Sequence, residues 1–261
     1  MIEKLTAWQL FDQVLRTFFL SIWRLALLVL ATVTVYATVW WLVLRDRPYI
    51  AAYHPIDPLE RLVTIAVIFS PLAVAVMRRT ILGKTRLRDW WQPSVWLIAG
   101  LIFLALIGLL LLEGYIANPL IYFSVTGDGG WISQTAWTLQ RWSYVALLVA
   151  VGARFVWMVP ALAVGRTKSV KVAFREIRGN YRLALLVCLL TVMPLYIFNY
   201  YFGYWSSIGS NARFYPFKSE LQAWVWLLKD GVVIAGRCIL LSALAAVIYR
   251  VEFGRRGVTA P

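Results

Sequence analysis

The sequence is poor in the residues that most often carry chemistry. It holds one histidine, two cysteines and 12 acidic residues among 261. Zinc-binding helices, serine nucleophile turns and cysteine–histidine pairs have recognisable spacings, and none of them stands in the sequence. Cys188 and Cys238 both fall inside apolar runs, without the spacing of a metal site or a disulfide framework. No local motif therefore predicts a catalytic residue, a metal site or a cofactor, although distant residues could still converge in an enzyme.

The single histidine lies in the stretch HPIDPLE, in which His54, Asp57 and Glu60 stand at intervals of three. Such spacing could suggest metal ligands. The same stretch fits a helix start better, with Asp57 as the N-cap, Pro58 in the first helical position and Glu60 three residues after the cap. We expect a helix from residue 58 and no metal site.

Charged residues are also scarce, at 15%, whereas 61% of the chain is apolar and 14 residues are tryptophan. The mean hydropathy is +0.72. A water-soluble globule of this size needs more polar cover, so we expect an all-α integral membrane protein. A membrane helix needs about 20 mostly apolar residues. Six runs meet this need and form one polytopic domain over 1–261: 25–44, 59–77, 95–112, 142–165, 183–204 and 223–249.

Lysine and arginine are distributed unevenly around these runs. Of the 26, 17 fall before the first run, in the second and fourth connections or after the last run, 5 fall in the other connections, and 4 lie within runs. The positive-inside rule then predicts that both termini are cytoplasmic. Trp90 and Trp91 beside Arg86 and Arg88 could stack on and clamp a nucleic acid. Orienting arginines and interfacial tryptophans explain them more simply, so we expect no nucleic-acid partner.

One phrase occurs twice, as WRLALLVLATV at 23–33 and as YRLALLVCLLTV at 181–192. An amphipathic stretch precedes each copy, and a weaker likeness joins PLAVAV at 71–76 to PALAVG at 160–165. The first amphipathic stretch has an apolar stripe at steps of three or four: Trp8, Phe11, Leu15, Phe18 and Ile22. We expect three tandem helical hairpins, with amphipathic cytoplasmic-surface helices before spans one, three and five.

The repeated arginines stand at the predicted cytoplasmic ends of two spans. There they can reach lipid phosphates while the preceding aromatic ring lies at the headgroup level. The candidate residues for binding anionic headgroups are Arg24, Lys168, Lys171, Arg175, Arg178 and Arg182. The alternative is that these cations only orient and anchor the chain.

A few charges fall near or within the predicted spans. A central arginine costs about 3 kcal/mol on insertion scales, so it should face the bundle interior and be paired. We expect the fourth and sixth helices to be neighbours, or to be bridged by the third, with Arg154 or Arg237 within reach of Asp230 or Glu113. Such a pair could line a polar pathway or could be structural.

The stretch RFVWMVPALAVGRTKSVKVAFREIRGNYRLALLV at 154–187 resembles bacterial multipass proteins related to the membrane domain of glycerophosphoryl diester phosphodiesterases. The matching positions are Arg154, Pro160, Ala161, Ala173, Arg178, Gly179 and Asn180. The resemblance implies a membrane module in a bacterial inner membrane. It transfers no catalytic residue, because the soluble phosphodiesterase domain is absent from this sequence.

Three function classes follow. The first, which we favour, is a non-catalytic membrane module whose basic cytoplasmic face binds anionic lipid or a partner membrane protein. The second is a transporter or channel for a small solute or lipid that uses the intramembrane charges. The third is a lipid-modifying enzyme, for which His54, Asp128 or Glu220 would have to converge around an outer pocket.

Overall fold

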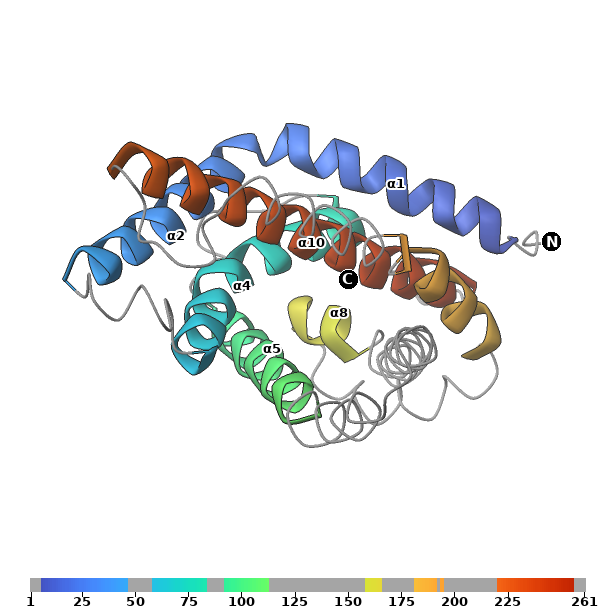
Figure 1. The fold of residues 1–261 in the computed structure, drawn as a ribbon. Coiled ribbons are helices and arrows are strands. Elements are labelled where there is room, and N and C mark those ends of the chain that lie inside the picture. Colours follow the sequence, from blue (N-terminus) through green and yellow to red (C-terminus); the bar gives the residue numbers. More distant parts are fainter. Residues whose placement is uncertain are drawn as a thin grey trace, which may run out of the picture.

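The computed structural model describes residues 6–46, 58–83, 92–112, 158–165, 181–191, 193–194 and 220–255. Over these ranges the chain is helical and contains no β-strand (Figure 1). The helices are α1 (Ala7–Arg24), α2 (Ala26–Asp46), α4 (Pro58–Leu82), α5 (Pro93–Leu112), α8 (Met158–Ala163) and α10 (Glu220–Arg255). A further apolar helix covers Tyr181–Thr191.

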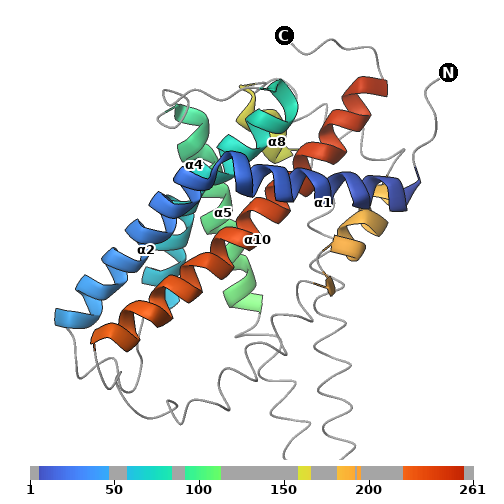
Figure 2. The ribbon, with the colours of Figure 1, turned by 90° about the horizontal axis from the view of Figure 1, so that it is seen from above.

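Helix α1 is the amphipathic helix predicted before the first span. It begins with a capping box, in which the Gln9 backbone donates to Thr6 Oγ1 at 3.3 Å and the Thr6 backbone donates to Gln9 Oε1 at 2.7 Å. A single residue, Leu25, separates α1 from α2, with φ −111° and ψ 20°. The chain changes direction there, and α2 turns away from the line of α1 (Figure 2).

Helix α4 begins at Pro58, as the HPIDPLE stretch predicts. It continues through Pro71, which has no N–H for the carbonyl of Val67 four residues earlier. Ser70 Oγ donates to that carbonyl at 3.2 Å, so the orphaned acceptor is satisfied within the helix. The helix ends before Gly83, whose φ of 75° suits a glycine helix stop. The predicted span ended at residue 77, so α4 is longer than expected.

Three helices are long and apolar enough to cross a membrane among the described residues: Ala26–Val43, Leu62–Leu82 and Trp224–Val251. They match the first, second and sixth predicted spans and indicate a multipass integral membrane protein. The third span corresponds to α5. Most of 142–165 and about half of 183–204 lie outside the described residues, so six spans remain a prediction. Of the surface helix expected at 78–94, residues 78–82 belong to α4, 93–94 belong to α5, and 84–91 lie outside the described residues. The one expected at 166–182 lies outside them except for 181–182.

Helix α10 lies at the centre of the described bundle and packs against α1, α2, α4 and α8. Three buried clusters surround it. The membrane-core cluster joins α10 to α2 and α4. The second cluster joins α4, α5 and α8, and the third joins α1 to the Tyr181–Thr191 helix and the last turns of α10. The central helix therefore links both ends of the chain to the spans between them.

The two ends of the described chain lie on the same side of the bundle. Leu10 near the start and Tyr249 near the end belong to one buried cluster. Figure 2 shows α1 crossing α10, with the last turns of α10 continuing beyond the crossing, while α2 runs away from this level. This arrangement agrees with an even number of membrane crossings.

Candidate functional site

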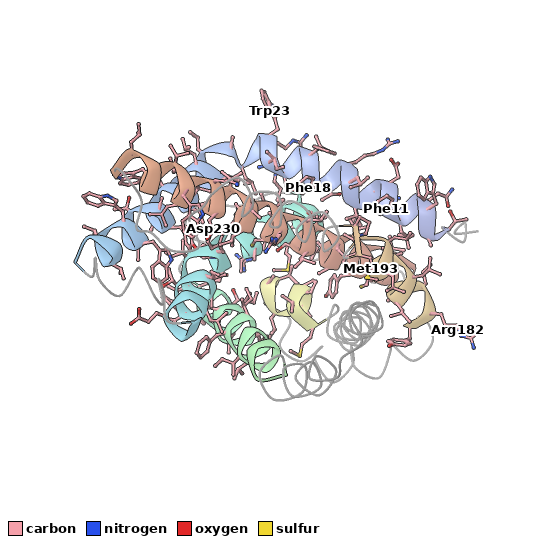
Figure 3. All side chains as sticks on the ribbon, viewed as in Figure 1. Phe11, Phe18, Trp23, Arg182, Met193 and Asp230 are labelled. Atoms are coloured by element: carbon pink, nitrogen blue, oxygen red, sulfur yellow. The ribbon has the colours of Figure 1, made fainter. Side chains whose placement is uncertain are left out.

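The two predicted headgroup-binding arginines that the structure describes are both exposed. Arg24 is the last residue of α1, and Arg182 stands at the start of the Tyr181–Thr191 helix. Trp23, beside Arg24, is 84% exposed. Figure 3 shows Trp23 and Arg182 pointing away from the bundle. The other four candidates lie outside the described residues: Lys168, Lys171, Arg175 and Arg178.

The fold does not bring Arg24 and Arg182 together. The Tyr181–Thr191 helix joins the N-terminal half of α1, where Val187 shares a buried cluster with Leu10 and Val14. Arg24 lies ten residues beyond Val14, which is about 15 Å along the helix. The two exposed cations therefore belong to a broad surface rather than to one pocket.

A buried arginine that the sequence did not single out lies at the end of α4. Arg78 is only 8% exposed. Its Nε donates to the backbone oxygen of Ala163 at 2.6 Å, and its Nη2 donates to Oε1 of Gln92. Ala163 is the last residue of α8, and Gln92 directly precedes α5. Arg78 thus holds the end of one helix and the start of another against α4.

The positive-inside count treated Arg78 as one of many orienting cations. A signal was nevertheless present, because Arg78 follows Val74 by four residues and so continues a buried face of α4. The two similar segments 71–76 and 160–165 meet beside it. Ala73 and Val74 of the first share a cluster with Ala163 of the second. The weak sequence likeness therefore corresponds to a real contact between α4 and α8.

Two further polar atoms are buried near the ends of α4 and α5. Nε of Arg79 and Oγ of Ser94 have no hydrogen-bond partner among the described residues. Arg79 follows Ala75 by four residues, so it lies on the face of α4 that joins the membrane-core cluster. Arg78 and Arg79 therefore differ in surroundings although they are adjacent.

The second polar feature lies within the span region, between α2 and α10. The phenol of Tyr36 donates to Oδ2 of Asp230 at 2.6 Å. Tyr36 is fully buried, and Asp230 is half-buried. This hydrogen bond satisfies the buried Tyr36 hydroxyl within an apolar part of the bundle. It links the first described span to the last.

Close packing surrounds this bond. A Cβ added to Gly231 would lie 3.1 Å from Cδ1 of Tyr36 and 3.2 Å from Cγ1 of Val33. The ring of Tyr36 makes edge-on contacts with Phe69 and Trp40, at centroid distances of 5.5 and 6.4 Å. The glycine lets α10 approach α2 closely enough for Asp230 to reach Tyr36.

Asp230 had been expected to approach Arg237 or Arg154. Arg237 is half-buried and lies seven residues further along α10, about 10 Å from Asp230 along the axis. Arg154 and Glu113 lie outside the described residues. The ion pair therefore stays a prediction. From the sequence we expected a cation as the partner of the Asp230 carboxylate. Tyr36 was not identified, although a phenol is also a hydrogen-bond donor.

The remaining sequence candidates add no further site to the described part of the chain. Cys188 and Cys238 are free thiols, and the Cys238 thiol donates to the backbone oxygen of Phe69 at 3.5 Å. No group of three histidine, cysteine or acidic side chains that could hold a metal ion occurs in that part. His54 and Asp57 lie outside it.

Comparison with known proteins found no relative: no family model, curated protein or solved structure matches the chain.

Proposed function

We propose that this chain is a non-catalytic multipass membrane module whose basic cytoplasmic face binds anionic lipid headgroups. The supporting observation is the exposure of Arg24 and Arg182, the arginines of the repeated aromatic–arginine pair. Arg24 ends α1 two residues before the apolar helix α2, and Arg182 lies in the first turn of the apolar Tyr181–Thr191 helix. A cation near an anionic membrane surface contributes about 1 kcal/mol. Six cations spread over this face would hold several lipids weakly rather than one lipid in a pocket.

The same proposal includes the arrangement of the chain in the membrane. It comprises six spans in three tandem hairpins, with both termini on the cytoplasmic side of a bacterial inner membrane. The excess of 17 cations over 5 between the two sets of connections supports this orientation. The resemblance of 154–187 to the phosphodiesterase-associated membrane domain also supports a module without chemistry of its own. A partner membrane protein is the alternative ligand for the same face.

Transport is the second candidate function, and the intramembrane carboxylate of Asp230 favours it. The packing between α2 and α10 counts against a water path at this point, because Tyr36 is fully buried and Gly231 leaves no room for a side chain. We therefore favour a structural role for the Tyr36–Asp230 bond. A continuous water-filled path reaching Arg154 would reverse that preference.

The test compares lipids retained through purification in a mild detergent. Arg24, Lys168, Lys171, Arg175, Arg178 and Arg182 are replaced by glutamine. Lys229→Gln is the matched control, because Lys229 is exposed on α10 near the predicted opposite boundary. We expect the six-fold variant to lose phosphatidylglycerol relative to phosphatidylethanolamine, measured by mass spectrometry, while the control keeps it. Unchanged lipid content in a folded six-fold variant would show that these cations only orient the chain.

A further inference from the structure

Helix α1 presents two separate apolar surfaces. One is buried against the bundle and contains Leu10 at 2% and Val14 at 0% exposure. The other, which we call the outer ridge, follows steps of three or four residues around the helix: Trp8, Phe11, Leu15, Phe19 and Trp23. The stripe predicted from the sequence contained Trp8, Phe11 and Leu15 of this ridge and missed the buried Leu10 and Val14. The residues that hold α1 to the protein are not those of the outer ridge.

Three aromatic residues of the outer ridge are exposed, and Phe11 and Leu15 between them are half-buried. Trp8 is 68% exposed, Phe19 is 65% exposed and Trp23 is 84% exposed. Trp8 and Phe11 lie with ring centroids 5.5 Å apart, so the first turns of the ridge form a continuous aromatic surface. Figure 3 shows Trp23 projecting away from the bundle. Water is an unfavourable environment for an apolar surface of this kind.

The position of α1 along α10 corresponds to a membrane boundary. The buried face of α1 shares a cluster with residues of α10 that begin at Leu244, twenty residues after Trp224, and continue to Tyr249 in the last turns of the candidate span Trp224–Val251. Twenty helical residues cover about 30 Å, which is the thickness of the hydrocarbon core. At the other boundary, Trp224 stacks on Trp41 at 5.6 Å, as expected for an interfacial aromatic pair. Helix α1 therefore crosses α10 at the opposite headgroup level.

The orientation of α1 about its own axis fits a helix that lies at the headgroup level. Phe18 and Ile22 lie between the buried face and the outer ridge, and they pack against the membrane-core cluster. On the other side of the helix, Gln9 and Gln13 are exposed. One side of α1 thus faces the hydrocarbon and the opposite side faces water. The apolar surface continues past the bend onto α2, where Leu27 is 84% exposed.

We propose that the outer ridge of α1 inserts into the leaflet on the side of the chain termini and binds lipid at the boundary between headgroups and acyl chains. Its occupant is the lipid surface itself. Aromatic rings favour this depth, and an amphipathic helix lying in the membrane plane buries its apolar face about 5–10 Å into that boundary.

Insertion of the outer ridge is distinct from headgroup binding by the basic face. The helix carries one acid and two arginines, and Arg16 pairs with Asp12 at 2.8 Å. Only Arg24 adds net charge to α1. The depth of the outer ridge in the membrane should therefore stay the same in neutral lipid and at high salt, where screening weakens the attraction between exposed charges.

Spin labels report the depth of each face. Single cysteines replace Phe19 or Trp8 on the ridge, and Gln13→Cys is the matched control on the same helix. Leu27→Cys provides a reference within the lipid-facing start of α2. All variants carry Cys188→Ala and Cys238→Ser and are reconstituted in vesicles of phosphatidylcholine alone or phosphatidylethanolamine with phosphatidylglycerol. Collision rates with oxygen and with a water-soluble nickel chelate are measured for each label.

We expect the ratio of oxygen to nickel collisions to be higher at the ridge positions than at Gln13→Cys, in both lipids and at high salt. Equal ratios would overturn the proposal. Loss of depth in phosphatidylcholine would also overturn it, because docking would then depend on charge. Exclusion of both reagents from the ridge would mean that protein, not lipid, covers it. The Trp8 and Phe19 positions are independent, so one unfolded variant leaves the other to decide.

Discussion

Arg78 and Ala163 are separated by 85 positions in sequence and are joined by a hydrogen bond of 2.6 Å in the fold. The acceptor is a carbonyl at the end of α8, where helical carbonyls lack partners within the helix and carry partial negative charge. A buried guanidinium is well suited to this place. It reaches α8 and, through Gln92, the start of α5 at the same time.

Replacement of Arg78 by lysine should destabilise the protein. Lysine keeps the charge but lacks the fork that reaches two acceptors, and losing a hydrogen bond from a charged group costs about 1.5–3 kcal/mol. Arg79→Lys is the adjacent control, because Nε of Arg79 makes no hydrogen bond within the described residues. Thermal unfolding in detergent, followed by helical circular dichroism, should show a lower Tm for Arg78→Lys than for Arg79→Lys. Equal losses would contradict a specific role for Arg78.

Removal of the Tyr36 hydroxyl should weaken the contact between α2 and α10. We expect Tyr36→Phe and Asp230→Ala to be non-additive, with a coupling energy of about 1 kcal/mol, as for hydrogen bonds between membrane helices. Thr38→Val serves as a control, since Thr38 bonds only within its own helix to the carbonyl of Thr34. Equilibrium unfolding in mixed micelles measures the cycle. Additive effects of Tyr36→Phe and Asp230→Ala would show that the bond contributes nothing.

Gly231 and Gly236 should respond differently to alanine, although both lie in α10. A Cβ at Gly231 would press on Tyr36 and Val33, whereas nothing lies within 4 Å of a Cβ at Gly236. Gly231→Ala should therefore cost about 1–3 kcal/mol through overpacking. Gly236→Ala should be neutral or stabilise the helix by up to about 1 kcal/mol. The same unfolding assay compares them, and a stable Gly231→Ala protein would refute the close approach of α2 and α10.

The predicted orientation can be checked with an impermeant thiol reagent on intact cells. Cysteines at Ser133 and Ser210 should react, because the positive-inside rule places both outside. A cysteine at Lys84 should react only after the membrane is opened. Labelling of Lys84→Cys in intact cells would invert the model. All three positions lie outside the described residues, so this experiment tests the topology independently of the fold.

The helix positions were predictable because their signals are local. A proline after a predicted acidic N-cap indicated the start of α4, which begins at Pro58. Apolar run length predicted the spans. The ends of α4 and α10 were less predictable, since both helices continue into polar residues beyond the hydrocarbon. The length of these helices depends on packing against neighbouring helices, and this packing cannot be predicted from the local sequence.

The polar contacts could not be predicted in the same way. Tyr36 resembles any other aromatic residue in an apolar run, and its partner lies in the last helix. Arg78 resembles the orienting arginines around it until the position of α8 is known. For a similar reason, the stripe predicted for α1 left out the buried Leu10 and Val14. Periodicity shows that a side is apolar, but not whether protein or lipid covers it.

The bond between Tyr36 and Asp230 also sets an order of events during synthesis, because its partners are 194 residues apart. At about 5–20 residues per second, Tyr36 is made about 10–40 s before its acceptor. Until the last helix is made, α2 lacks the partner that covers Tyr36 and Val33. A chain released before Asp230 would leave this buried face open to lipid or to other nascent helices. The last span therefore covers the face of α2 that stays open until then. We expect quality control of truncated chains to act on this uncovered face of α2.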